Sequence, residues 1–201
     1  MSNIQRPQQI SQILTSALTL LENGTSWENL DFALIADHSE INADVIKLYF
    51  HSKADLYKSL MMLIDRRIED EADKDLPGET PRDRLFELLM LRFDILNEHR
   101  AAYQHLFYQT FKDPKLFRTA LPRFHESMDI MLRLADLNGR DGTGCPPLRT
   151  TAVAIVFLNA ARIWLDDDSK DMAPTMAELD RGLAKLDQAR DYIPEAFKRF
   201  V

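Results

Sequence analysis

Apolar residues recur at intervals of three and four along most of the chain, which is the period of an amphipathic α-helix. The first such series begins at Ile10, and Asn23-Gly24 ends it with residues that readily form a left-handed helix cap. Thr25-Ser-Trp-Glu28 matches a capping box and predicts a second helix, which ends near His38. Asn42 is a favoured N-cap for a third, short helix. Together these series predict a tri-helical unit.

Longer helical patterns follow this unit. Ser52 is a candidate cap for a fourth helix, which fades into the acidic run Glu69–Asp75. Leu76–Pro81 contains two prolines and a glycine and interrupts the pattern. We expect Pro122 to kink a later helix and residues 138–147 to form a flexible loop. Five more apolar series have the helical period, at residues 86–96, 103–111, 117–135, 153–164 and 176–186.

The series divide the chain into an N-terminal head, residues 1–55, and a C-terminal body, residues 56–201. Six glycines and nine prolines in 201 residues are too few for a sheet sandwich built on many tight turns. No segment shows the alternation of a strand. We therefore expect an all-α fold of about nine helices.

The charge balance limits the partners of the chain. Twenty-five Lys and Arg against 32 Asp and Glu give a net charge of −7, the wrong sign for a surface that wraps nucleic acid or an anionic membrane. Any DNA contact must be local. The single cysteine, Cys145, excludes an intramolecular disulfide and fits a reducing compartment. No apolar run is long enough to span a membrane, so we expect a cytoplasmic protein.

The head carries a recognisable set of anchors. Ile35-Ala36, Tyr49-Phe50 and Ser52-Lys53 stand at the spacing found in the helix-turn-helix of the TetR family of bacterial regulators, and the match spans roughly residues 10–60. The chain resembles that family in length and helix number as well. The resemblance implies a ligand-responsive transcriptional regulator that binds operator DNA. It also implies a body that binds a small apolar ligand and forms a homodimer through its last two long helices.

The start of the third helix is the part of such a head that enters the major groove. Lys47 and Lys53 could contact phosphates, and the Tyr49 hydroxyl could donate to one. Asn42 or Val45 could approach a base edge. On the opposing interpretation, the lysines are ordinary solvated charges. The predicted DNA-contacting residues are Ser26, Asn42, Val45, Lys47, Tyr49 and Lys53.

The head also departs from the family pattern. Glu40 stands where the family has its turn glycine, Asp44 replaces a small residue, and Lys47 replaces a tyrosine. The first sixty residues contain four bases against seven acids, and an acidic face weakens the phosphate contribution to DNA binding.

A second resemblance, over roughly residues 81–190, is to the lipid-binding accessory proteins of coenzyme Q biosynthesis, which have a TetR-like fold. It rests on Pro81–Phe86, Arg92–Leu96, Asp168–Asp171, Thr175-Met176 and Leu179–Arg181. This resemblance implies an alternative function, the binding of a lipid or quinone precursor by a protein whose head does not read DNA.

The body has more aromatic and methionine side chains than simple packing requires, which predicts a pocket for a small apolar ligand. The opposing interpretation is that many of them are only core. Tyr103, His105 and Asn159 are polar candidates for orienting a ligand. The predicted ligand-binding residues are Phe86, Met90, Phe93, Tyr103, Phe107, Phe111, Phe124, Met128, Met131, Phe157 and Trp164.

The last helical series has apolar residues at spacings of four and three, which is typical of a helix–helix interface. The predicted dimer interface is Met172, Met176, Leu179, Leu183 and Leu186. The tail Tyr192–Val201 has apolar and basic residues side by side, and it could lie on a membrane surface. Docking of the tail onto the body or onto a dimer partner is the other interpretation.

Enzymatic and metal-binding motifs are missing from the sequence. The five histidines show no pair at i, i+4 and no cysteine partner at ligand spacing, so we expect no metal. Asp166-Asp167-Asp168 would point in different directions from a helix end, and we expect these carboxylates to be solvated. No nucleophile elbow or phosphate loop is present. We therefore expect neither catalysis nor a cofactor.

Overall fold

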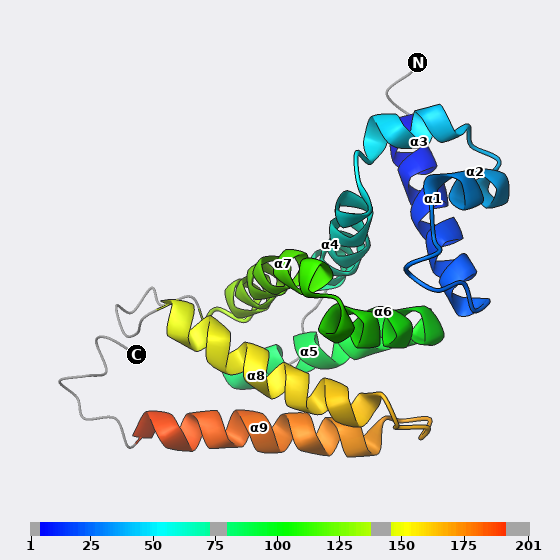
Figure 1. The fold of residues 1–201 in the computed structure, drawn as a ribbon. Coiled ribbons are helices and arrows are strands. Elements are labelled where there is room, and N and C mark those ends of the chain that lie inside the picture. Colours follow the sequence, from blue (N-terminus) through cyan, green and yellow to red (C-terminus); the bar gives the residue numbers. More distant parts are fainter. Residues whose placement is uncertain (1–4, 73–79, 138–145, 192–201) are drawn as a thin grey trace. The chain divides into compact units, whose positions relative to one another are not determined.

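The computed structural model describes residues 5–72, 80–137 and 146–191. Within these residues the chain forms only α-helices, turns and bends, as the periodicity predicts (Figure 1). The predicted loop at 138–147, the cysteine at 145 and the tail Tyr192–Val201 lie wholly or largely outside them. The nine described helices are α1 Gln5–Glu22, α2 Phe32–Ser39, α3 Ala43–Tyr49, α4 Lys53–Ala72, α5 Pro81–Asn97, α6 Arg100–Lys112, α7 Pro114–Leu134, α8 Pro146–Trp164 and α9 Ala173–Asp191.

The chain packs into two compact units. Unit 1 comprises Met1–Ile64 and Ile95–Arg123, and unit 2 comprises Asp65–Asp94 and Phe124–Val201. Unit 1 therefore contains the predicted head together with α6 and parts of α4, α5 and α7. The chain passes from one unit to the other within these last three helices. The domain boundary at residue 55 stays a prediction, and it lies elsewhere than this packing boundary.

The end of α1 follows the predicted pattern. Unit 1 buries five apolar residues of this helix, Ile13, Leu14, Ala17, Leu18 and Leu21. After the helix, the Thr25 amide donates to the Leu20 carbonyl at 3.0 Å, and Gly24 has a φ of 91°. A Cβ atom at Gly24 would meet nothing within 4 Å, so the backbone angle alone requires glycine there.

The second helix starts later than predicted. Residues 25–30 form a turn, and α2 begins at Phe32 with Asp31 as its N-cap, whose side chain accepts from the Leu34 amide at 2.8 Å. The capping-box prediction was wrong: Ser26, and not Thr25, accepts from the amide three residues on, and the segment is held by a residue of a distant helix. The N–H of Trp27 donates to Nε2 of His105 on α6 at 2.9 Å, and the Trp27 side chain is buried. A tertiary contact has overridden a local pattern.

The caps of the next two helices are confirmed. Asn42 is the N-cap of α3, and its side chain accepts from the Asp44 amide at 2.8 Å. Ser52 precedes α4 and accepts from the Asp55 amide at 3.2 Å, while its hydroxyl donates to the Asp55 carboxylate at 2.9 Å. Between α2 and α3, Glu40 adopts the left-handed conformation, with φ 55° and ψ 22°. The residue in the family's glycine position thus has a backbone angle that favours glycine.

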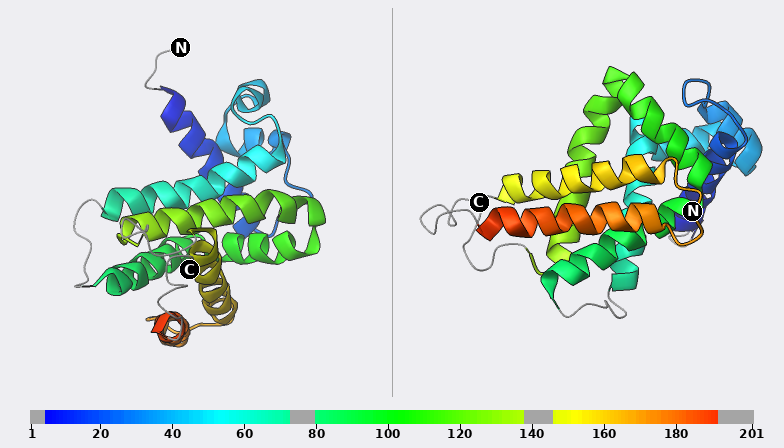
Figure 2. Two further views of the ribbon diagram at one scale, coloured as in Figure 1. Left: turned by 90° about the vertical axis from the view of Figure 1, so that its left-hand side faces the viewer. Right: turned by 90° about the horizontal axis from the view of Figure 1, so that it is seen from below.

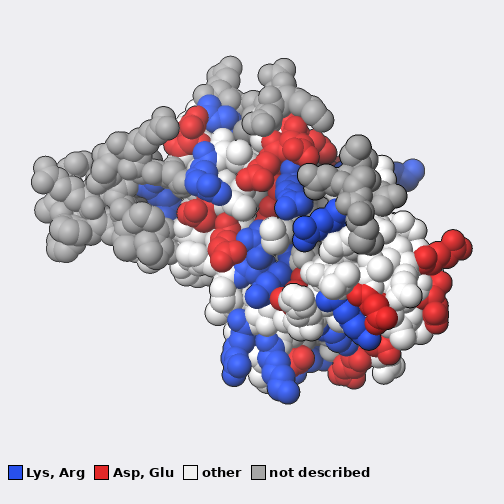
Figure 3. Space-filling view, turned by 90° about the horizontal axis from the view of Figure 1, so that it is seen from above, with Lys and Arg blue, Asp and Glu red and all other residues white. Residues whose placement is uncertain are grey.

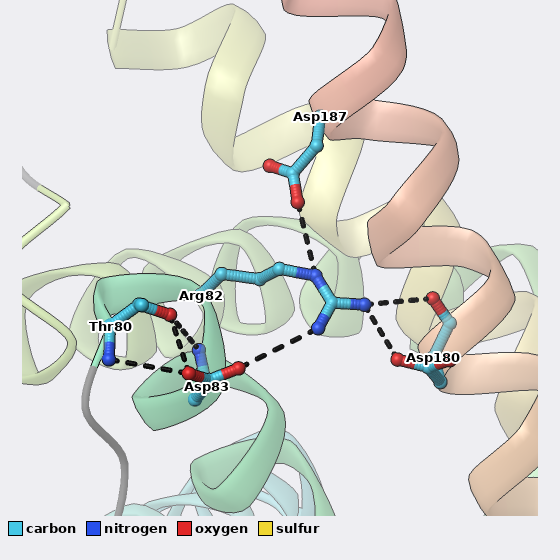
Figure 4. Close-up of polar contacts among 5 residues, drawn as sticks. All are labelled: Thr80, Arg82, Asp83, Asp180 and Asp187. Atoms are coloured by element: carbon cyan, nitrogen blue, oxygen red, sulfur yellow. Dashed lines mark hydrogen bonds and ion pairs between the residues drawn. The ribbon is translucent and has the colours of Figure 1, made fainter.

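In unit 2, α8 and α9 lie side by side and antiparallel (Figures 1 and 2). Their closest approach is at Gly182, where a Cβ atom would lie 2.6 Å from Cγ1 of Val156. The N-terminal turn of α5 also reaches α9. Arg82 binds the carboxylates of Asp180 at 2.6 Å and Asp187 at 3.0 Å, as Figure 4 shows.

The connection before α9 corrects the expectation of a solvated acidic end. Asp166 and Asp168 are exposed, but Asp167 is buried. One Asp167 oxygen accepts from the Ser169 amide and hydroxyl, and the other accepts from the amide and hydroxyl of Thr175 in the first turn of α9. Burial raises the pKa of Asp167, but these hydrogen bonds outweigh it and lower the pKa to about 2.

Candidate nucleic-acid interface and ligand site

The exposed surface of α3 is formed by Asp44, Lys47 and Leu48. Lys47 Nζ lies 3.7 Å from the Asp44 carboxylate, and both side chains are largely exposed. Leu48 is 68% exposed, more than any other large apolar residue described as exposed. Sequence reasoning did not select Leu48, although it stands between two predicted contact residues and outside the apolar period set by Ile46 and Phe50.

Three of the predicted DNA contacts have local structural roles. Asn42 uses its side-chain oxygen to cap α3. The Ser26 hydroxyl accepts from the Asn29 amide at 3.3 Å within the turn before α2. Val45 is half-buried. The polar side chains of Asn42 and Ser26 are therefore already engaged, one at the start of α3 and the other in the turn before α2.

Tyr49 joins the end of α3 to α1. Its hydroxyl donates to Oε1 of Gln9 at 2.7 Å, and the guanidinium of Arg6 lies 5.6 Å from the centre of its ring. A tyrosine hydroxyl has one proton to donate. Tyr49 thus fixes α3 on α1 in this structure and donates to a protein side chain.

Lys53, the first residue of α4, is turned toward the segment before α2. Its Nζ donates to the carbonyl of Trp27 and, at 3.1 Å, to that of Glu28, and it lies 5.1 Å from the centre of the Trp27 ring. Burial lowers the pKa of Lys53, against the opposing attraction of Asp31, Glu28 and Asp113. An ammonium has three N–H donors, so one remains after the two carbonyls are satisfied.

Both signs of charge occur on the side of the molecule that carries α3 in Figure 1, as Figure 3 shows. Acidic Asp37, Glu40 and Asp44 are exposed on α2, α3 and the turn between them, beside the exposed Lys47. The surface of the helix-turn-helix is therefore not uniformly basic. A uniformly basic surface would gain most of its affinity for DNA from contacts with phosphates. A DNA interface on this surface would have to depend on a few placed side chains.

The predicted ligand-binding residues fall into both units. In unit 2, the rings of Phe93 and Phe157 are stacked with centroids 4.7 Å apart, and Trp164 and Phe124 adjoin this pair. In unit 1, Tyr103 is buried, whereas Phe111 is 58% exposed. The unit 2 members of the predicted set are Phe86, Met90, Phe93, Phe124, Met128, Met131, Phe157 and Trp164.

The polar candidates for a ligand are not brought together. Tyr103 and His105 belong to unit 1, where His105 accepts from the Trp27 amide, and Asn159 is exposed in unit 2. A second histidine of unit 1, His99, lies 3.1 Å from the Glu22 carboxylate. These contacts join α6 to the helix-turn-helix and leave the unit 2 aromatic cluster without a polar residue from the predicted set.

Sequence reasoning missed a buried ion pair in unit 2. Arg92 on α5 donates to Oδ1 of Asp65 on α4 at 2.6 Å, and Ser127 on α7 donates to the same oxygen. All three residues are at least 97% buried, and the Arg92 guanidinium lies 5.6 Å from the centre of the Phe157 ring. The position of Arg92, three residues after Leu89, was the available indication, because it continues the buried stripe of α5.

Solved structures give the decisive comparison. The TetR transcriptional regulator from Nitrosomonas europaea is 20% identical to this chain, with a TM-score of 0.72, and the match covers 89% of this chain and 98% of that one. The present chain has the TetR fold. A TetR-family regulator from Streptomyces coelicolor matches with 17% identity, a TM-score of 0.62, and coverage of 96% and 87%. One from Rhodococcus sp. RHA1 matches with 18% identity, a TM-score of 0.62, and coverage of 92% and 97%.

The TetR fold is thus established by structure while the sequence has diverged. No family model matches the chain, and neither does any curated protein. The apolar anchors predicted for the helix-turn-helix lie wholly or partly in the interior of unit 1. Ile35 and Phe50 are buried in unit 1, and Ala36 is half-buried.

The TetR fold buries most of the predicted dimer interface inside the protomer. Leu179 and Leu183 are at most 3% exposed and face α8, Met172 is buried, and Leu186 is half-buried. Met176 alone of the predicted set is exposed, at 40%. The apolar spacing of α9 thus corresponds to its packing on α8. An interface formed by this helix pair must use residues exposed on it, such as Met176 and Ile155.

Two searches of the described part of the TetR fold gave no candidate. It contains no group of three or more His, Cys, Asp and Glu side chains placed to hold a metal ion. None of its helices combines the length and the apolar character needed to cross a bilayer. The predicted membrane contact of the tail falls outside the described residues.

Proposed function

We propose that this protein is a transcriptional regulator that binds operator DNA through α2 and α3 and is controlled by a small apolar ligand. The observation that carries the proposal is α3 itself, which presents Lys47 and Leu48 to solvent from a helix fixed at both ends. Asn42 caps its start, and Tyr49 ties its end to α1. A rigid, exposed helix of this kind suits the major groove.

The exposed side chains suggest how bases are read. Leu48 offers an apolar contact to a thymine methyl group, and Lys47 can donate to a phosphate or to a guanine edge. Lys53 has one N–H left for a phosphate, and its two carbonyl bonds hold it in place. Tyr49 acts by positioning α3. The acids Glu40 and Asp44 reduce non-specific attraction and leave affinity dependent on the correct bases.

Control by a ligand and assembly as a homodimer complete the proposal. The aromatic cluster of unit 2, around Phe93 and Phe157, is the proposed ligand site. Two heads of a symmetric dimer would meet half-sites one DNA turn apart. The ligand would act by binding better to one of two states of the dimer, which differ in the spacing of the heads.

Selection from a pool of random duplex DNA, at low and moderate salt, tests the proposal. The variants are Lys47→Glu and Leu48→Ser on α3, with Lys185→Glu, an exposed lysine of α9, as the matched charge control. We expect an enriched palindromic site that Lys47→Glu abolishes and Lys185→Glu retains. Leu48→Ser should relax the preference at one base pair, by about 1–3 kcal/mol of discrimination. No enrichment at low salt would refute DNA reading.

A second candidate function is the binding of a lipid or quinone precursor by a protein whose head no longer reads DNA. The internal engagement of Tyr49 and Lys53 and the acids around α3 favour it. Mass spectrometry of lipids extracted with the purified protein tests this alternative. A stoichiometric isoprenoid or acyl species together with no DNA enrichment would favour it, and an empty extract would contradict it.

A further inference from the structure

An apolar surface is exposed where α6 ends and α7 begins in unit 1. Tyr108 and Phe111 on α6 are 49% and 58% exposed, and Phe117 and Leu121 on α7 are 38% and 52% exposed. Two of these rings belong to a continuous series, because Phe107 lies 5.1 Å from Phe111 and Phe111 lies 6.1 Å from Phe117, centre to centre. We call Tyr108, Phe111, Phe117 and Leu121, with the cations described next, the α6–α7 corner.

Three exposed cations accompany these rings. Lys112, Lys115 and Arg118 are exposed, and within the described residues none of them forms an ion pair. The sequence from Ala101 to His125 contains a single acid, Asp113. Its side chain is engaged in starting α7, where it accepts from the Lys115 amide at 2.8 Å. The corner is therefore locally basic in a chain whose net charge is −7.

We propose that the α6–α7 corner docks on the surface of an anionic lipid bilayer. Aromatic and leucine side chains gain free energy at the boundary between headgroups and acyl chains, and lysine and arginine beside them are attracted to anionic headgroups. The long stems of Lys112 and Lys115 let the ammonium groups stay at headgroup level while the rings enter the interface. The proposal does not depend on DNA or ligand binding by the chain.

The charge distribution favours a bilayer over other partners. Duplex DNA would attract the cations, but beyond its thymine methyl groups it offers little apolar surface for four exposed side chains. The negative net charge of the chain repels an anionic bilayer, which favours an approach through this corner among the described residues. The exposed residues of the corner come from the end of α6 and the start of α7. A bilayer surface, which is broad and deformable, can contact both helices at once.

Co-sedimentation of the full chain with lipid vesicles tests the proposal. One set of vesicles is phosphatidylcholine alone, and the other is equal parts phosphatidylcholine and phosphatidylglycerol. We expect binding to the anionic vesicles that decreases with salt and is much weaker on neutral ones. The double variant Phe111→Ser/Phe117→Ser should abolish binding. Lys115→Glu should weaken it about 5-fold or more, from the attraction of one basic residue to an anionic surface.

Controls separate this corner from other surfaces. Lys185→Glu and Leu148→Ser change an exposed lysine and an exposed leucine of unit 2 and should leave vesicle binding unchanged. A chain ending at residue 191 removes the basic tail and should still bind. Thermal unfolding of each variant checks that it is folded, and Lys115→Glu, at an exposed residue, should melt like the parent. Absence of binding, loss of binding only in the shortened chain, or equal binding to both kinds of vesicle would each overturn the proposal.

Two further outcomes would assign the corner to a nucleic acid or to a protein partner. If Lys115→Glu weakens non-specific DNA binding and the phenylalanine double variant does not weaken vesicle binding, the corner is a nucleic-acid surface and the proposal fails. If the corner variants lose only a protein partner and not the vesicles, the proposal fails equally.

Discussion

The backbone N–H of Trp27 donates a 2.9 Å hydrogen bond to Nε2 of His105, seventy-eight residues later in the chain. The bond requires that Nε2 carry no proton. It joins the turn before α2 to α6, and Lys53 holds the carbonyl of the same residue. Trp27 is therefore fixed by both its amide and its carbonyl, which explains why the segment does not continue as a helix.

We predict that His105→Leu lowers the free energy of unfolding by about 1–3 kcal/mol, because the Trp27 N–H loses its acceptor. His105→Gln places an amide oxygen at a similar reach and should recover most of that loss. Denaturant unfolding of the three proteins measures the difference. Equal stability of the Leu and Gln variants would show that the hydrogen bond contributes nothing beyond packing.

Glu40 should be a destabilising residue, since it holds a left-handed backbone at φ 55°. Glu40→Gly removes a steric cost of about 1–2 kcal/mol and adds chain entropy to the unfolded state worth up to about 1 kcal/mol. We expect a net gain of about 0.5–1 kcal/mol in thermal or denaturant unfolding. Glu40→Gln keeps the backbone cost and should leave stability unchanged, which separates conformation from charge.

Gly24 provides the converse substitution. Its φ is 91° and a Cβ atom there would meet nothing within 4 Å, so Gly24→Ala changes only the backbone. We expect a loss of about 1 kcal/mol in the free energy of unfolding. A gain in stability would mean that the end of α1 rearranges without cost.

The Asp167 carboxylate should make stability depend on pH in the acid range. Its pKa in the folded protein is about 2, against 3.8 for the free group. The contribution is therefore complete above about pH 4 and is lost as the pH falls toward 2, with a total of about 2 kcal/mol. Asp167→Asn should be less stable at neutral pH, and the difference from the parent should shrink between about pH 4 and 2.

The exposed neighbour Asp168 is the control for this titration, and Asp168→Asn should follow the parent at every pH. A difference between the parent and Asp167→Asn that stays constant from neutral pH to pH 2 would contradict the assignment. It would mean that the bonds from Ser169 and Thr175 do not favour the ionised form.

The contact between Gly182 and Val156 predicts that the effect of Gly182→Ala on stability depends on the residue at position 156. Gly182→Ala improves helix propensity by about 1 kcal/mol, but its Cβ would lie 2.6 Å from Cγ1 of Val156, and overpacking costs about 1–3 kcal/mol. We expect the single variant to be less stable than the parent. In a Val156→Ala background the same substitution should be stabilising. A double-mutant cycle with no coupling would refute the contact.

Elements with a long, regular apolar period could be predicted from the sequence. The end of α1 at Asn23-Gly24 and the caps Asn42 and Ser52 are set by residues within one turn, so local chemistry decides them. The start of α2 could not be predicted in this way. Thr25 and Glu28 match a capping box, but the residues that hold this segment, His105 and Lys53, lie on distant helices.

The same distinction between local patterns and contacts with distant residues applies to the candidate sites. Sequence reasoning selected Lys47 for its place in a motif, and the structure exposes it as such a role requires. The apolar period of α9 could not distinguish a dimer interface from packing within the protomer, and Leu179 and Leu183 face α8. Arg92 was missed because a buried charge shows only through its partner, Asp65, which lies on another helix.

Pro122 has a mechanical consequence. The chain crosses between its two units at Ile64–Asp65, Asp94–Ile95 and Arg123–Phe124, each inside a helix. In α4 and α5 the amides around the crossing can form the full hydrogen-bond ladder of a stiff rod. In α7 the crossing follows Pro122, which has no N–H to offer the Arg118 carbonyl. The missing bond falls directly before the passage from unit 1 to unit 2, so local opening of α7 at this point breaks one backbone hydrogen bond fewer than opening of α4 or α5.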